Sequence, residues 1–117
     1  MKGIKRFEDL PVWKDAVELA AEIYQFSDNG RLSKDYGTKD QIRRASLSIS
    51  NNISEGFEYD NNREFIKYLR YAKGSAGEVR SMINVLFKIK YIDRESYKHY
   101  YNKVTALSKQ IRWFIKY

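Results

Sequence analysis

The longest regular apolar pattern in the chain lies between about residues 62 and 90, and it strongly limits the possible folds. Apolar side chains recur there at steps of three and four, the spacing of one face of an α-helix. This seam consists of Phe65, Leu69, Ala72, Ala76, Val79, Ile83 and Leu86. A long helix with one apolar face is stable in water only when other helices cover that face. The pattern therefore predicts a helical bundle.

A first, shorter helix is expected over about residues 11–26. Pro11 suits its first turn, where the missing N–H would have no partner in any case. The predicted apolar stripe contains Trp13, Ala16, Val17, Ala20, Ile23 and Tyr24. Turn residues then interrupt the pattern over residues 27–37.

The second helix is expected over about residues 38–56. Thr38 and Gln41 have the spacing of a capping box, in which two side chains satisfy the free N–H groups of the first turn. Gly56 is the predicted stop, because glycine tolerates the left-handed conformation that ends many helices. The expected buried face consists of Ile42, Ala45, Ile49 and Ile53.

Caps also mark the third and fourth helices, which are expected over about residues 62–90 and 94–116. Asn61 and Asp93 stand at the two N-cap positions. Gly74 and Gly77 interrupt the third helix, and we interpret them as a tight helix crossing, with a local bend as the alternative. The fourth helix should bury Tyr97, Tyr101, Val104, Leu107, Ile111, Phe114 and Ile115.

Only a very short link, Tyr91–Asp93, separates the third and fourth helices. Such a link forces neighbouring long helices to run antiparallel. We therefore predict an all-α fold, an antiparallel up-down four-helix bundle, formed by residues 1–117 as one domain.

Several functional classes find no support in the residue types present. The chain has no cysteine, and its one histidine is His99, so neither a thiolate metal site nor a Ser/His/Asp triad is expected. No phosphate-binding glycine loop precedes a helix. No signal peptide and no run of 18 apolar residues is evident. We expect a non-enzymatic cytoplasmic protein with no metal, no cofactor and no membrane span.

The positive charge is concentrated in the second half of the chain. Residues 1–60 hold 9 Lys/Arg and 11 Asp/Glu, a net −2, whereas residues 61–117 hold 13 and 4, a net +9. Within the third helix, a one-sided basic stripe comprises Arg63, Lys67, Arg70, Lys73 and Arg80. The first three fall in a sector of about 60°, nearly opposite the apolar seam. The stripe is either a solvated face or a phosphate-binding surface.

Arg43 and Arg44 are adjacent on the second helix and so point about 100° apart. One of them is a candidate phosphate contact, while the other packs along the bundle. The alternative is an ion pair with an acid such as Asp40 or Glu55. The tyrosines of the last third, Tyr91, Tyr97, Tyr100 and Tyr101, are interpreted as core and interface residues, with base stacking as the alternative.

Three segments in order resemble one bacterial family. They are residues 7–13 (FEDLPVW), residues 41–56 (QIRRASLSISNNISEG) and residues 65–75 (FIKYLRYAKGS) followed by Glu78. Together they are similar to the four-helix-bundle family of the 23S ribosomal RNA intervening-sequence protein, over nearly the whole chain. The resemblance implies a left-handed up-down bundle, a ring-like homopentamer and no catalytic residues.

A related branch, the accessory proteins of diversity-generating retroelements, forms a basic pentameric barrel that engages nucleic acid and a reverse transcriptase. Our hypothesis is therefore a non-enzymatic assembly protein that binds RNA or DNA through the basic stripe, helped by Arg43 or Arg44. The alternative is a protein-interaction scaffold with no nucleic-acid ligand.

Overall fold

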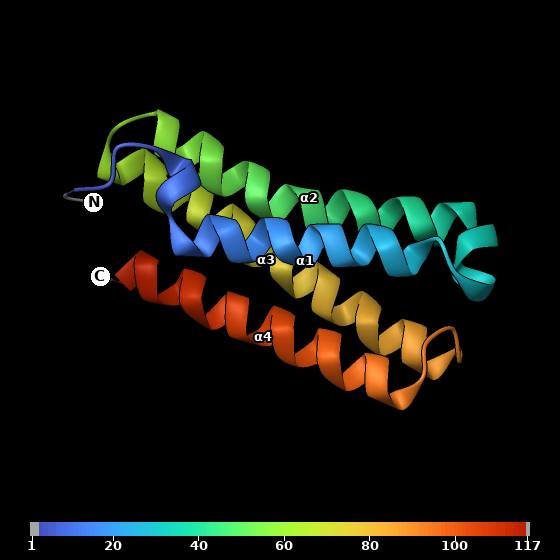
Figure 1. The fold of residues 1–117 in the computed structure, drawn as a ribbon. Coiled ribbons are helices and arrows are strands. Elements are labelled where there is room, and N and C mark those ends of the chain that lie inside the picture. Colours follow the sequence, from blue (N-terminus) through green and yellow to red (C-terminus); the bar gives the residue numbers. More distant parts are fainter. Residues whose placement is uncertain (1–2, 117) are drawn as a thin grey trace.

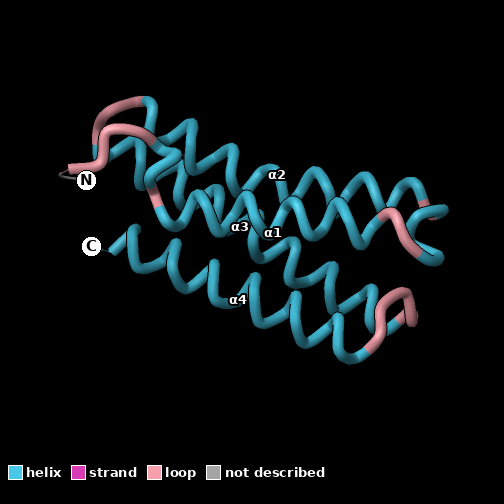
Figure 2. Tube along the Cα trace, in the orientation of Figure 1, coloured by secondary structure: helices cyan, strands magenta, loops and turns pink. Residues whose placement is uncertain are grey.

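The computed structural model describes residues 3–116, which form an antiparallel bundle of four α-helices. The helices are α1 (Pro11–Ser27), α2 (Tyr36–Glu58), α3 (Asn62–Lys88) and α4 (Arg94–Lys116), with short 3-10 helices η1 (Phe7–Asp9) and η2 (Gly30–Lys34). Successive helices run in opposite directions along a body of 44 × 21 × 20 Å (Figure 1). Helix dominates the described chain, which contains no strand, and short loops join the helices (Figure 2). The predicted all-α bundle is confirmed.

Two of the predicted caps are present and one is misplaced. Asn61 Oδ1 accepts a hydrogen bond from the N–H of Glu64 at 2.8 Å, and Asp93 Oδ1 accepts one from the N–H of Ser96 at 2.8 Å. The prediction that α2 begins at Thr38 is wrong, because Asp35 is its N-cap and the helix begins at Tyr36. Asp35 accepts from both the N–H and the hydroxyl of Thr38, at 3.2 and 3.0 Å.

Asp35 also holds together two segments that are distant in the sequence. The hydroxyl of Tyr91 donates to Asp35 Oδ2 at 3.0 Å, which ties the α3–α4 connection to the start of α2. The hydrogen bonds from Thr38 and Tyr91 lower the pKa of Asp35 below its usual range. The N-cap of α2 therefore also links two segments that lie 56 residues apart in the sequence.

The glycines have roles opposite to those expected from the sequence. Gly56 does not end α2; it is buried inside the helix, and a Cβ placed there would lie 2.6 Å from Tyr68 Cβ. The close helix approach is therefore at Gly56, between α2 and α3. A Cβ at Gly74 or Gly77 would meet nothing within 4 Å, so the predicted tight crossing at these residues is wrong.

The core lies along the bundle axis, and the seam of α3 supplies its centre. All seven predicted seam residues of α3 are buried, as are the four predicted on α2. On α1 the prediction was partly wrong, because Val17 and Tyr24 are exposed while Val12 and Leu19 are fully buried. On α4, Val104, Leu107 and Ile111 are buried, and the other predicted residues are partly buried against them.

The α1–α4 pair makes the sparsest contact among neighbouring helices and is held partly by charge. Lys103 Nζ lies 2.7 Å from Glu18 Oε1 and also pairs with Glu22, whose other carboxylate oxygen is 2.7 Å from His99 Nε2. Burial alone would raise the pKa of Glu22, but the hydrogen bonds from Lys103 and His99 lower it below the usual value. The acidic side of α1 thus neutralises one cation of α4.

Candidate nucleic-acid interface

The basic stripe predicted on α3 lies on its outer surface. Arg63, Arg70 and Arg80 are exposed, Lys67 is half exposed, and Lys73 is half-buried. No acid of residues 3–116 forms an ion pair with Arg63, Arg70 or Arg80. Lys67 has a loose ion pair with Glu64, 3.7 Å from Nζ to Oε2. Most cations of the stripe therefore face solvent, and no carboxylate of the described residues neutralises them.

Contacts to the neighbouring helices show which residues of the stripe lie beside α4. The hydroxyl of Tyr97 on α4 donates to Asn84 Oδ1 at 2.7 Å, which marks the α4 flank of α3. At 100° per residue, Lys73 and Arg80 lie about 20° and 40° from Asn84. These two cations therefore stand beside α4, whereas the hydroxyl of Ser75 contacts α2 through Ser48 at 2.9 Å.

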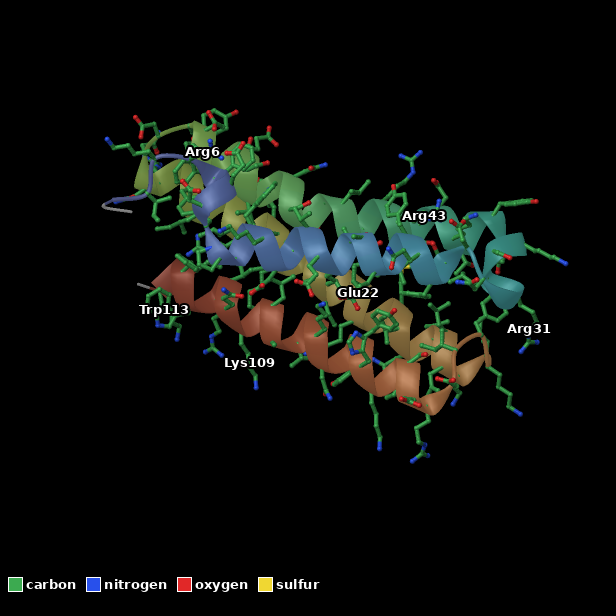
Figure 3. The ribbon with its side chains drawn as sticks, viewed as in Figure 1. Arg6, Glu22, Arg31, Arg43, Lys109 and Trp113 are labelled. Atoms are coloured by element: carbon green, nitrogen blue, oxygen red, sulfur yellow. The ribbon has the colours of Figure 1, made fainter. Side chains whose placement is uncertain are left out.

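The sequence reasoning missed the contribution of α4. This helix holds six Lys/Arg and a single Asp/Glu, and α3 holds six and two. Five cations of α4 are exposed and lie on the side of the helix away from Lys103 and α1: Arg94, Lys98, Lys109, Arg112 and Lys116. Charge counting by helix, instead of by half-chain, would have found them. Figure 3 shows nitrogen-tipped side chains along this outer edge of α4, Lys109 among them.

We call the two sets together the basic face. It comprises Arg63, Lys67, Arg70, Lys73 and Arg80 of α3 with Arg94, Lys98, Lys109, Arg112 and Lys116 of α4. By contrast, α1 holds one Lys and three Asp/Glu, and α2 holds three of each sign. The α3–α4 side of the bundle is therefore strongly basic, whereas α1 is slightly acidic.

Arg43 lies apart from the basic face, because its side chain points from α2 to the end of α1 (Figure 3). Its guanidinium donates to Ser27 Oγ at 2.7 Å, to the carbonyl of Tyr24 at 3.0 Å and to Asp28 Oδ1 at 2.8 Å. It also covers the Tyr24 ring, 4.3 Å from the centroid. All these contacts close the α1–α2 corner, so Arg43 has a structural role here.

Arg44 pairs with Asp40 on its own helix, with 2.7 Å between Nε and Oδ2. This is the alternative that the sequence left open for it. The hydrogen bond to Asp40 raises the pKa of Arg44, and the side chain remains 79% exposed. The structure thus separates the two arginines: one is occupied within the bundle, and the other is accessible.

A tyrosine cluster that the sequence reasoning did not single out lies where α2 meets α3. The Tyr59 and Tyr68 rings stack at 5.3 Å between centroids, and Tyr71 meets Tyr68 edge-on at 5.5 Å. The hydrogen bond between the Tyr68 and Tyr59 hydroxyls, with partial burial and the nearby Glu55 charge, raises the pKa of Tyr68 to about 12. Tyr59 and Tyr71 are each about half exposed.

The tyrosines predicted as core and interface residues line the α3–α4 and α1–α4 contacts. Tyr97 stacks on Phe87 at 4.5 Å, and Tyr100 lies 4.6 Å from the Phe26 ring. With Tyr91 and Tyr101 they pack partly buried against the core. Their rings are thus engaged within the bundle, which agrees with the core interpretation.

Among residues 3–116, no helix is long and apolar enough to cross a bilayer. No three His, Asp or Glu side chains in this part of the chain stand close enough together to hold a metal ion.

Taken together, the helix order and the one-sided charge define a four-helix bundle with a basic surface. A family model described as 23S rRNA-intervening sequence protein matches residues 8–112, and the chain belongs to this family. A crystal structure of a protein of unknown function from the S23 ribosomal protein family of Bacteroides thetaiotaomicron is similar, with a TM-score of 0.82 and 30% identity. The match covers 91% of this chain and 99% of that chain. A comparison with curated proteins finds no match.

Proposed function

We propose that this protein is a non-enzymatic, cytoplasmic homo-oligomer that binds RNA or DNA through the basic face. The observation that carries the proposal is the gathering of ten exposed or half-exposed cations on α3 and α4, with few acids among them. A surface of this kind gains affinity for a polyanion by releasing condensed counterions, whatever the base sequence. Arg44 is accessible enough to extend the contact, whereas Arg43 is committed to the α1–α2 corner.

The proposed assembly is the homopentamer implied by the family resemblance. A ring would repeat the basic face around its axis, and several weak phosphate contacts would then act as one multivalent surface. Sedimentation or light scattering measures the mass directly. A monomer at the concentrations used for binding would contradict this part of the proposal.

Charge reversal on α3 tests the binding surface. The triple variant Arg63→Glu, Lys67→Glu, Arg70→Glu lowers the net charge from +7 to +1. We expect it to lose nucleic-acid binding while keeping its helical content and its oligomer mass. The matched control reverses three exposed lysines outside the basic face, Lys5, Lys14 and Lys34, and reaches the same net charge.

The control variant separates a surface effect from a bulk charge effect. If both triple variants lose affinity equally, the net charge and not the basic face drives binding, and the proposed surface is wrong. If the α3 variant binds as the parent does, the surface is equally excluded.

A protein-interaction scaffold is the second candidate, and the tyrosine cluster favours it. Exposed tyrosines are enriched in protein interfaces, where the ring is buried and the hydroxyl finds a partner. The carboxylates Glu55 and Glu58 line a hollow beside Tyr59, which suits a protein partner better than a phosphate backbone. Replacing Tyr59 and Tyr71 by serine would weaken a protein complex or the ring but leave nucleic-acid affinity per subunit unchanged.

A further inference from the structure

One cleft of the bundle combines an exposed tryptophan with the edge of the basic face. It lies between the start of α3 and the end of α4, has a volume of about 520 Å³, and is lined by Asn62, Phe65, Ile66, Trp113, Phe114, Ile115 and Lys116. This volume lies within the range of small-molecule pockets, about 300–1,000 Å³. Its wall is mainly aromatic and aliphatic, unlike the charged surface next to it.

Trp113 lines this cleft and lies outside the bundle core. Its side chain is 57% exposed and stands edge-on to Phe114, with 5.2 Å between ring centroids and 87° between ring planes. In Figure 3, Trp113 and Lys109 project from the same side of α4, away from α1. Trp113 is not isolated, because it lines the cleft with Phe65, Ile66, Phe114 and Ile115, and contiguous apolar surface of this kind marks interaction sites.

Cations surround the cleft on both helices. Lys116 lines it, Lys109 lies one helical turn before Trp113, and Arg63 directly follows Asn62 at the start of α3. All three cations are exposed. An aromatic cleft between cations suits a ligand that joins a flat ring to an anionic backbone. A nucleotide unit of a nucleic acid has this chemistry.

A cleft of this kind accepts single-stranded nucleic acid more readily than a duplex. In a duplex the bases are stacked and paired, so their faces are closed to a side chain that does not unstack them. In a single strand each base presents a π-face, and stacking on tryptophan needs no particular sequence. We propose that this cleft holds an unpaired base against Trp113, so that the protein prefers single-stranded nucleic acid. The inference rests on the proposed function and specifies its ligand.

Fluorescence tests the inference, because the chain has only two tryptophans. The Trp13→Phe variant leaves Trp113 as the sole indole, and the Trp113→Phe variant leaves Trp13, which is partly buried against Phe7. With oligo-dT, we expect saturable quenching in the first variant and none in the second. With a blunt hairpin duplex, neither variant should be quenched.

Affinity supplies a second readout. Trp113→Ala should weaken oligo-dT binding by about 5- to 150-fold, the range for losing one stacked base. It should change duplex binding by less than about 2-fold, since phosphate contacts remain. The matched control is Tyr36→Ala, which removes a 75% exposed aromatic ring from the start of α2 and should leave both affinities unchanged.

The outcomes separate this inference from the proposed function. If the parent protein binds oligo-dT at low salt but Trp113 is neither quenched nor needed, the cleft does not hold a base and the function stands. If the parent binds no nucleic acid at low salt, the function itself fails. If Trp113→Ala lowers the oligomer mass, Trp113 is a subunit contact. If it lowers the affinities for oligo-dT and for the duplex equally, Trp113 is a structural residue. Either result overturns the inference.

Discussion

The two kinds of glycine in the bundle predict stability changes of opposite sign for the same substitution. Gly74 faces open space on α3, and its backbone is helical. Glycine inside a helix costs about 1 kcal/mol relative to alanine. Gly74→Ala should therefore raise the free energy of unfolding by about 1 kcal/mol, and Gly77→Ala should act similarly.

Gly56→Ala gains the same helix propensity but meets a steric conflict. The new Cβ would lie 2.6 Å from Tyr68 Cβ, where ordinary contacts are 3.4–4 Å. Because the atom struck is the first side-chain carbon, no rotamer change relieves the overlap, and the two helices must separate. Overpacking costs about 1–3 kcal/mol, and the upper part of that range outweighs the propensity gain. We expect a net loss of about 2 kcal/mol.

Thermal unfolding followed by circular dichroism measures both effects, at one fixed protein concentration because oligomer dissociation shifts the midpoint. For a domain of this size 1 kcal/mol corresponds to roughly 4 °C. The midpoint should rise by about 4 °C for Gly74→Ala and fall by about 8 °C for Gly56→Ala. A stable Gly56→Ala would refute the close approach of α2 and α3. A destabilised Gly74→Ala would mean that another backbone occupies the space beside α3.

Three further changes test separate parts of the bundle. In a urea titration, Arg43→Ala should lower the free energy of unfolding by about 2 kcal/mol, because it leaves Ser27 and the end of α1 without a charged donor. The control Arg44→Ala should have little effect in the same measurement. Thr105→Val should stabilise by about 1 kcal/mol in calorimetry, since the Thr105 hydroxyl is buried with no hydrogen-bond partner among the described residues. Glu22→Gln should cost about 1 kcal/mol at neutral pH. Because the folded state lowers the pKa of Glu22, its contribution is present above the usual value of 4.5 and is lost as pH falls through the folded pKa. The free energies of unfolding of the parent and of Glu22→Gln should then converge in acid. A difference that stays constant with pH would contradict a stabilising ion pair at Glu22.

The sequence predicted well whatever depends on neighbours within one helix. The seam of α3 repeats every three or four residues, and its seven members are all buried. The caps at Asn61 and Asp93 are likewise local patterns, with donor and acceptor three residues apart. Such features follow from helix geometry alone, before any tertiary contact forms.

Features that depend on contacts between helices were predicted less well. Gly56 and Gly74 look alike in a sequence, and only the packing of Tyr68 across α2 and α3 distinguishes them. Asp35 caps α2 through Thr38, a local pattern that the prediction missed, and only its further bond from Tyr91 joins distant parts of the chain. Arg43 appeared as a candidate phosphate contact, and its partners lie at the C-terminal end of α1, 15 to 19 residues away. The α4 half of the basic face was missed for another reason, because charge was counted by half-chain and not by helix.

The salt dependence of single-strand binding tests the central claim most directly. For a single strand, the logarithm of the binding constant falls with the logarithm of salt concentration by about 0.7 for each phosphate neutralised. If about five cations of the basic face take part, fluorescence anisotropy with labelled oligo-dT should give a slope near −3.5. The triple charge reversal on α3 should reduce the magnitude of the slope by about 2. A parent protein with no detectable binding at low salt, or with a slope that charge reversal leaves unchanged, would contradict the account.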